Sequence, residues 1–301
     1  MARPFSFAPF KNNWRGALLV IVLFGPHCLF GAERQPGSYL GWEREAQEAF
    51  ASGKHQEAVA MTDQAVARYP NPRNYLIRGR LLEATRAFTN AIADYDRVLR
   101  SQTNSAEAYL ARGGARFRLG QVEDALADFD KFNELQPKMA TYNWQRGIAL
   151  YYVKRFDDGR KQFELHQTLN ANDVENAVWH FLCVTRTSGI EKARAALLPI
   201  PGDPRVPMMQ IHALFADKLK PGDVMKAAEA GDPEKRPTQL FYAHLYLGLY
   251  YEARNEDKPA REHITKAAEL FDAGGYMGDV ARVHLQRRWP KAADAPAAKP
   301  N

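Results

Sequence analysis

The chain has 301 residues and a formal net charge of +6. Its first 32 residues hold three basic residues and no acid, which leaves 38 basic against 35 acidic residues in the remainder, a net charge of +3 with the signs well mixed. Nucleic-acid binding needs a dense patch of one sign, so this balance argues against a nucleic-acid partner. Of the two cysteines, Cys28 lies in the N-terminal segment. If that segment is removed, Cys183 has no disulfide partner within the chain.

Residues 1–32 have the pattern of a secretory signal. A basic start is followed by an apolar run over residues 17–24, a Gly25–Pro26 break and the small residues Gly31 and Ala32. The run is shorter than the ~20 apolar residues that span a bilayer. An uncleaved anchor over residues 16–32 stays open as an alternative, because Phe30 occupies a position where cleavage prefers a small side chain. We expect an exported protein of the periplasm or cell envelope, which meets the membrane only through this segment.

Small residues recur along the rest of the chain at a stride of 33 or 34 residues: Ala58, Ala91, Ala125, Gly159, Ala193, Ala227 and Ala260. A second set precedes each of them by twelve residues: Ala46, Gly79, Gly113, Gly147, Phe181, Phe215 and Gly248. A fixed stride of this length predicts stacked helix pairs.

The clearest copies read "EAYLARGGARFRLGQVEDALADFDKFNELQP" and "AHLYLGLYYEARNEDKPAREHITKAAEL". They resemble the tetratricopeptide-repeat family, and the resemblance covers about residues 39–274. It implies an all-α solenoid of about seven antiparallel helix pairs and a C-terminal capping helix. The expected repeats are 39–71, 72–105, 106–139, 140–173, 174–207, 208–240 and 241–274, followed by the capping helix at 275–289 and a disordered tail at 290–301.

Within a repeat, Gly113 and Ala125 are expected where the two helices cross most closely, since a larger side chain would push the axes apart. Gly120 is expected to make the turn with a positive φ. Phe181 and Phe215 replace the close-contact glycine in the fifth and sixth repeats, so those pairs should splay. The proline-rich segments 197–207 and 229–237 should shorten the second helices there.

No motif for catalysis stands out. Phosphate-binding loops, GxSxG elbows and HExxH helices are missing from the sequence. His180 and Cys183 have a spacing that could ligate a metal or pair a nucleophile with a base, but they lie in an apolar helix where a cysteine usually packs as a small hydrophobe. We therefore predict no enzyme, no metal and no cofactor. An unrecognised enzymatic site in repeats five and six remains an alternative.

The resemblance implies that first helices line the inner, partner-binding groove. Carried over position by position, it gives these candidates: Arg80, Phe117, Arg118, Trp144, Tyr151, Tyr152 and Arg186. Such a set would suit an extended peptide with apolar and acidic groups. The alternative is that Trp144 and one tyrosine pack between repeats. A clamp for a chaperone's C-terminal carboxylate is not expected, because Leu76 and Leu110 stand where that subtype has lysine or asparagine.

The expected function is a non-catalytic scaffold or adaptor of the cell envelope with protein or peptide partners. The chain loosely resembles periplasmic tetratricopeptide-repeat lipoproteins of Gram-negative bacteria, which implies envelope proteases or cell-wall hydrolases as partners. The residues before Cys28 read "GPH" rather than a lipidation motif, so we predict no lipid anchor. A carrier or assembly subunit of an outer-membrane or secretion complex is the alternative.

Overall fold

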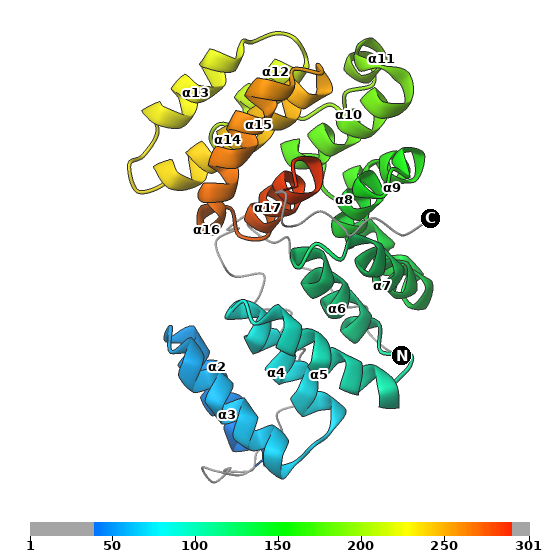
Figure 1. The fold of residues 1–301 in the computed structure, drawn as a ribbon, viewed down its shortest axis with the longest axis vertical. Coiled ribbons are helices and arrows are strands. Elements are labelled where there is room, and N and C mark those ends of the chain that lie inside the picture. The colour runs from blue at the N-terminus through cyan, green and yellow to red at the C-terminus, as the bar shows by residue number, and fades with distance from the viewer. Residues whose placement is uncertain (1–38, 291–301) are drawn as a thin grey trace, which may run out of the picture. The chain divides into compact units, whose positions relative to one another are not determined.

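A computed structural model describes residues 39–290. These residues form sixteen α-helices and one 3-10 helix with no strand among them, which confirms the all-α expectation (Figure 1). The predicted signal segment and residues 291–301 of the predicted tail lie outside the described residues. The chain divides between Arg86 and Ala87 into two compact units, unit 1 and unit 2.

Unit 1 contains α2 (Tyr39–Ala51), α3 (His55–Arg68) and α4 (Pro72–Ala84). Ala46, Ala49, Ala58 and Leu81 form its apolar cluster, so its helices approach through small side chains. α4 begins with two standard signals: Asn71 accepts a hydrogen bond from the Asn74 N–H, and Pro72 fills the first helical position.

Unit 2 contains the remaining helices in chain order. Their bounds are α5 (Phe88–Ser101), α6 (Ala106–Arg118), α7 (Val122–Leu135), η1 (Pro137–Tyr142), α8 (Trp144–Tyr152), α9 (Phe156–Gln167), α10 (Val174–Ser188), α11 (Ile190–Ala195), α12 (Met208–Phe215), α13 (Pro221–Ala230), α14 (Arg236–Ala253), α15 (Asp257–Glu269), α16 (Phe271–Gly274) and α17 (Tyr276–Arg288). Most successive helices pack on each other, and one apolar cluster runs from Phe117 to Val283. α14 begins within the range expected for the sixth repeat.

The close crossings occur where the sequence placed them. A Cβ on Gly113 would lie 2.7 Å from the Phe129 ring, and one on Gly147 would lie 2.6 Å from the Phe163 ring. A Cβ on Gly248 would meet Ile264 at 2.6 Å. These distances leave no room for a methyl group, so the helices of these pairs depend on glycine to approach each other.

The turn inside each helix pair also repeats. Gly120 has φ +78°, as expected, and the equivalent turns at Gly53, Arg86, Lys154 and Asn255 also have positive φ. Three of these five residues are not glycine, so the left-handed conformation is imposed by the turn rather than by the residue type. The positive φ therefore recurs at the repeat spacing even where the glycine does not.

The fifth and sixth repeats depart from the pattern. α11 ends at Ala195, before the first proline-rich segment, and α13 ends at Ala230, at the start of the second, so both second helices are short, as predicted. The rings of Phe181 and Phe215 meet edge to face at 5.0 Å, and so fill the space between α10 and α12. The small residue buried on α13 is Ala228 instead of Ala227, which corrects the sequence register by one position.

Arg205 holds the irregular segment between α11 and α12. Its guanidinium pairs with Asp173 at 2.8 Å, with Asp203 at 2.6 Å and with Glu175. Two of these acids lie at the start of α10, so the segment is fastened to that helix by charge-assisted hydrogen bonds instead of by an apolar face.

Candidate functional site

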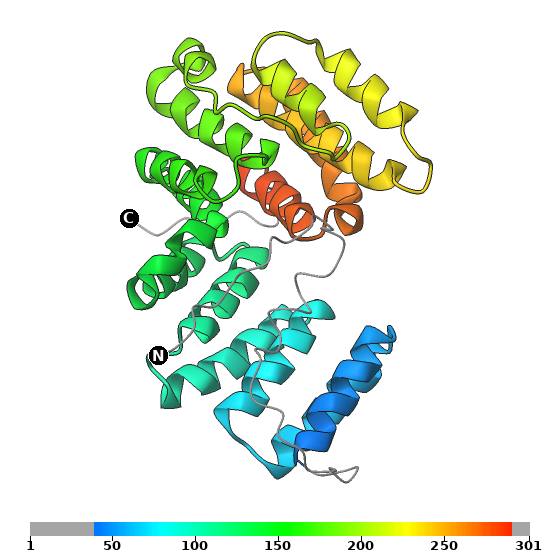
Figure 2. The ribbon, with the colours of Figure 1, turned by 180° about the vertical axis from the view of Figure 1, so that it is seen from behind.

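The C-terminal helix α17 is the feature that organises the candidate site. We expected it to cap the last helix pair, and it does pack on α15; it also reaches back to α6, more than 150 residues earlier in the chain. Figures 1 and 2 both show α17 inside unit 2, with α14 and α16 to one side and α6 and α8 to the other. Four of the residues predicted to line an open groove, Phe117, Arg118, Trp144 and Tyr152, therefore face the chain's own helix.

Tyr276, the first residue of α17, is enclosed by three of the predicted site residues. Its ring stacks on Phe117 at 5.7 Å, meets Trp144 edge to face at 5.1 Å and lies 4.9 Å beneath the Arg118 guanidinium. Aromatic and cation–π contacts of this kind each stabilise a pair by about 0.5–1.5 kcal/mol beyond simple burial. We call Phe117, Arg118, Trp144 and Tyr152 the α6–α8 surface.

Charges at both ends of α17 complement the helices that it touches. Arg118 lies 3.6 Å from Asp279, and both side chains are largely buried, with 13% and 3% exposed. Nearer its C-terminal end, Arg287 pairs with Glu123 at 2.6 Å across a more exposed contact. These two pairs set the position of α17 along α6 and the turn that follows it.

A buried polar network lies between these two pairs. The Tyr152 hydroxyl lies 3.1 Å from His284 Nδ1, and His284 Nε2 lies 2.7 Å from Glu252 on α14. Glu252 also accepts a hydrogen bond from Arg186. This geometry suits a ring whose Nδ1 accepts from the tyrosine while its protonated Nε2 faces the carboxylate.

The pKa values in this network follow from burial and neighbouring charge. Burial raises the pKa of Tyr152 well above its ordinary value, so the hydroxyl stays protonated. Burial alone would also raise the pKa of Glu252, but the nearby His284 and Arg186 lower it below the usual range. The network thus contains a neutral tyrosine and a charged carboxylate, which is a structural arrangement for holding α17 in place.

The remaining candidates divide between packing and the network. Tyr151 is 6% exposed and packs edge to face on Trp179 at 5.4 Å, as the between-repeats alternative expected for one tyrosine. Arg186 donates to the Tyr151 hydroxyl as well as to Glu252. Arg80 lies on α4 in unit 1. Whether any of these residues contacts a partner stays a prediction.

Sequence reasoning missed the other half of the site, which α17 and α14 provide. Tyr276 was predicted only on an apolar face of the capping helix, and Asp279, His284 and Glu252 were not singled out. The spacing of the first three is three and five residues, so they share one helix face. That spacing predicts a face to bury, but nothing in it names α6 and α8 as the neighbours.

Comparison with known families identifies the repeats. A family model described as "Tetratricopeptide repeat" matches residues 43–106 and 88–140. Residues 43–140 belong to the tetratricopeptide-repeat family. The rest of unit 2 continues the same succession of packed helix pairs. A comparison with curated proteins found no match.

One solved structure extends the likeness in fold beyond those residues, and two more resemble the chain less well. A tetratricopeptide-repeat protein from Parabacteroides merdae matches with a TM-score of 0.55 and 17% identity, over 83% of this chain and 98% of that one. YrrB, described as having an unusual peptide-binding site, gives a TM-score of 0.43 and 16% identity over 73% and 96% of the two chains. The first tetratricopeptide-repeat domain of Spaghetti (RPAP3), bound to an HSP90 peptide, gives a TM-score of 0.32 and 26% identity. That match covers 36% of this chain and 86% of the other.

The helix pairs of unit 2 bury the pair that sequence reasoning weighed as a nucleophile or a metal site. Cys183 is fully buried, and burial raises the pKa of its thiol, which disfavours the reactive thiolate. His180 Nε2 lies 3.4 Å from Glu164, and burial lowers the pKa of the ring. Among residues 39–290 no three His, Cys, Asp or Glu side chains gather as metal ligands.

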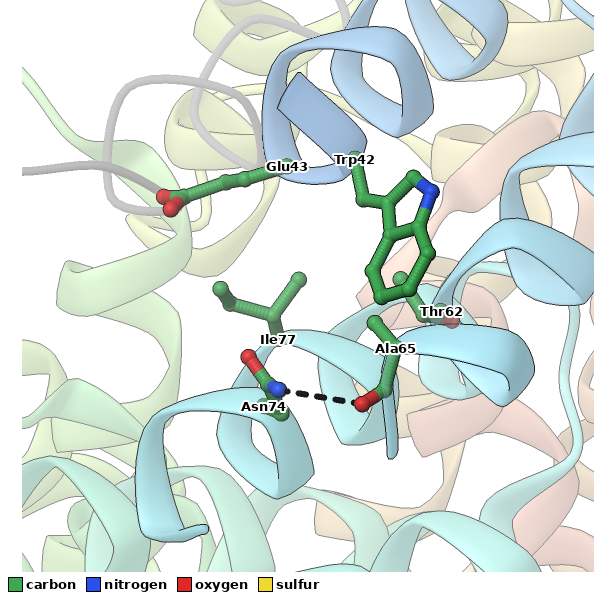
Figure 3. A pocket seen from close by; sticks show the side chains of 6 residues that line it. All are labelled: Trp42, Glu43, Thr62, Ala65, Asn74 and Ile77. Carbon is green, nitrogen blue, oxygen red and sulfur yellow. Dashed lines mark hydrogen bonds between the residues drawn. The ribbon is translucent and has the colours of Figure 1, made fainter. Parts of the chain in front are cut away.

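Unit 1 has one small pocket beside its tetratricopeptide helices. Figure 3 shows Trp42, Thr62 and Ile77 around it, and Asn74 donates to the Ala65 carbonyl at 3.3 Å on its wall. Its volume is about 10 Å³, which is close to the minimum of ~10–15 Å³ for a single water. It is too small for an organic ligand. None of the helices within residues 39–290 has the length and apolar character needed to cross a bilayer.

Proposed function

We propose that this chain is a non-catalytic adaptor that binds segments of partner proteins through the first helices of its repeats. Tetratricopeptide repeats are a general protein–protein interaction module. The observation that carries the proposal is the α6–α8 surface. Its aromatic rings and Arg118 enclose Tyr276, and Arg118 also pairs with Asp279. Aromatic and arginine side chains in this arrangement are those that most often anchor protein interfaces.

We propose further that the adaptor acts in the cell envelope, with proteases or cell-wall hydrolases among its partners. The support for export is the composition of residues 1–32, a basic start followed by a short apolar run. Mass spectrometry of the mature N-terminus from fractionated cells tests this part. Recovery of the chain in the cytoplasmic fraction with residues 1–32 intact would contradict it.

The adaptor function is tested by capture of partners with the full chain from membrane and soluble envelope fractions. We compare the wild type with Tyr152→Ala/Arg118→Glu and with Arg254→Glu, which removes an exposed pair with Glu256 and a contact with the Tyr250 ring, both outside the α6–α8 surface. We expect the wild type to capture discrete proteins that exchange readily. The amount of these proteins recovered should change severalfold with the double variant and stay the same with the control.

Two results would contradict the adaptor proposal. One is the absence of any specifically captured protein with all three chains. The other is stable, stoichiometric co-purification with a membrane complex, which is the behaviour of a carrier or assembly subunit. Circular dichroism of each variant confirms that the helices are retained.

A further inference from the structure

One face of α17 makes the aromatic, ionic and hydrogen-bond contacts with the α6–α8 surface. Its residues are Tyr276, Asp279, Val280, Val283, His284 and Arg287, at spacings of three, one, three, one and three. These positions form a continuous stripe along an α-helix. Val280 and Val283 are at most 2% exposed, so the stripe combines an apolar centre with polar anchors along its length.

Each polar position of the stripe meets a side chain of matching chemistry. The tyrosine enters an aromatic and guanidinium enclosure, the carboxylate of Asp279 faces Arg118, and the ring of His284 faces Glu252. The Val280 carbonyl lies 3.5 Å from the Tyr152 hydroxyl. The surface therefore recognises a helix by a defined order of groups, since an aromatic residue, an acid and a cation must follow one another at helical spacing.

The connection to α17 can act as a hinge. Gly275, immediately before the helix, has φ +55° and ψ −127°, a conformation that side-chain-bearing residues rarely adopt. α16, which precedes it, has four residues. No side-chain cap fixes the start of α17. A glycine without a side-chain cap thus joins α17 to the helix before it.

From these observations we infer that the α6–α8 surface is a docking site for an amphipathic helix and that α17 is its resident occupant. A partner gains the site by presenting the same stripe, an aromatic residue followed by an acid at +3, β-branched residues at +4 and +7 and a cation at +11, in place of α17. This inference rests on the proposed adaptor function and names its partner class. Exchange of one such helix for another restores the contacts of the stripe, so the competition is set by tethering and by the charge pairs.

Tethering favours α17 strongly. A segment joined by a short linker competes at an effective concentration on the order of millimolar. A free helix at micromolar concentration therefore binds wild-type chain weakly, and binding rises when the contacts of α17 are weakened. This dependence separates an exchangeable occupant from a permanent core helix.

The experiment uses the full chain and fluorescein-labelled peptides of residues 275–290 as the probe, read by fluorescence anisotropy. In Arg118→Asp chain, the resident Asp279 faces a like charge, whereas a peptide with Asp279→Arg restores an opposite pair. We expect this peptide to bind the variant at least ~10-fold more tightly than the wild-type peptide does. Arg254→Asp, the same charge change at an exposed pair elsewhere, should bind both peptides as weakly as wild type.

A second, more exposed pair protects the test against misfolding. Glu123→Arg chain with the Arg287→Glu peptide repeats the reversal where the Glu123 side chain is 65% exposed, so the fold should tolerate it. Equal binding of matched and mismatched peptides in both reversed chains, with α17 amides exchanging as slowly as those of α8, would overturn the inference. If that result accompanies unchanged partner capture by Arg118→Asp chain, the adaptor function stands and only the helix-exchange inference fails. Loss of capture by every chain is the failure of the adaptor function itself.

Discussion

Gly147 is a test of how much single residues determine the repeat. Its missing side chain lets α8 approach Phe163 on α9. Gly147→Ala should destabilise the chain by about 1 kcal/mol, because overpacking outweighs the helix preference of alanine over glycine. Urea unfolding followed by circular dichroism measures the change.

Gly222 on α13 is the matched control, since nothing lies within 4 Å of a Cβ built there. Gly222→Ala should leave stability unchanged or raise it by up to ~1 kcal/mol. Equal effects of the two substitutions would show that the close approach at Gly147 does not limit packing.

Cys183 is predicted to be chemically inert. Burial raises the pKa of its thiol, and its sulfur would lie 2.9 Å from a Cβ on Gly159, so the side chain is enclosed between α9 and α10. In a Cys28→Ser chain at pH 8, a disulfide reagent should label Cys183 on the order of 100-fold more slowly in the folded state than in urea. Labelling in the folded state at the urea rate would instead indicate an accessible thiolate and revive the enzyme alternative.

At the scale of elements, helix pairs are held by polar contacts as well as by their apolar faces. His244 on α14 and His263 on α15 approach through their Nδ1 atoms at 2.9 Å. Burial, followed by the charges of His263 and Lys266, lowers the pKa of His244 from 6.5 to about 4. The folded state thus favours the neutral ring.

This pair predicts an acid-sensitive contribution to stability. Between pH 6.5 and about 4 the unfolded chain binds a proton at His244 that the folded chain does not, so stability is full above this window and falls as the pH drops through it. After allowance for solvent screening, the loss should be on the order of 1 kcal/mol. Urea titrations at several pH values should give a flatter dependence for His244→Gln than for wild type. His55→Gln, in unit 1, controls for loss of a histidine elsewhere, and an unchanged slope in His244→Gln would rule out this source.

At the scale of the whole molecule, the two units differ in how they are stabilised. Unit 1 gathers alanines and one leucine, whereas the cluster of unit 2 includes large side chains such as Trp179 and Phe215 and is closed by α17. Apolar area buried sets much of local stability. We therefore predict that α2 and α3 exchange amide hydrogens at lower denaturant concentration than α8 and α10. Hydrogen exchange with mass spectrometry tests this, and identical protection in the two units would refute it.

The repeat architecture could be predicted because its requirements are local and periodic. Close crossings need glycine or alanine at fixed positions, and the turn needs a residue that tolerates positive φ, so each copy reveals the same stride. The prediction was less accurate where that requirement is relaxed: on α13, Ala228 is buried instead of Ala227, and α14 begins earlier than expected.

By itself, the sequence of this protein determined the helical repeats, their glycine-dependent crossings and the early ends of α11 and α13. Only the tertiary structure decided what faces Arg118, Trp144 and Tyr152. Their neighbours come from α17, more than 120 residues later in the chain. A helical stripe specifies that one face must be buried, but many surfaces can bury it, and the choice is made by side chains that folding alone brings together.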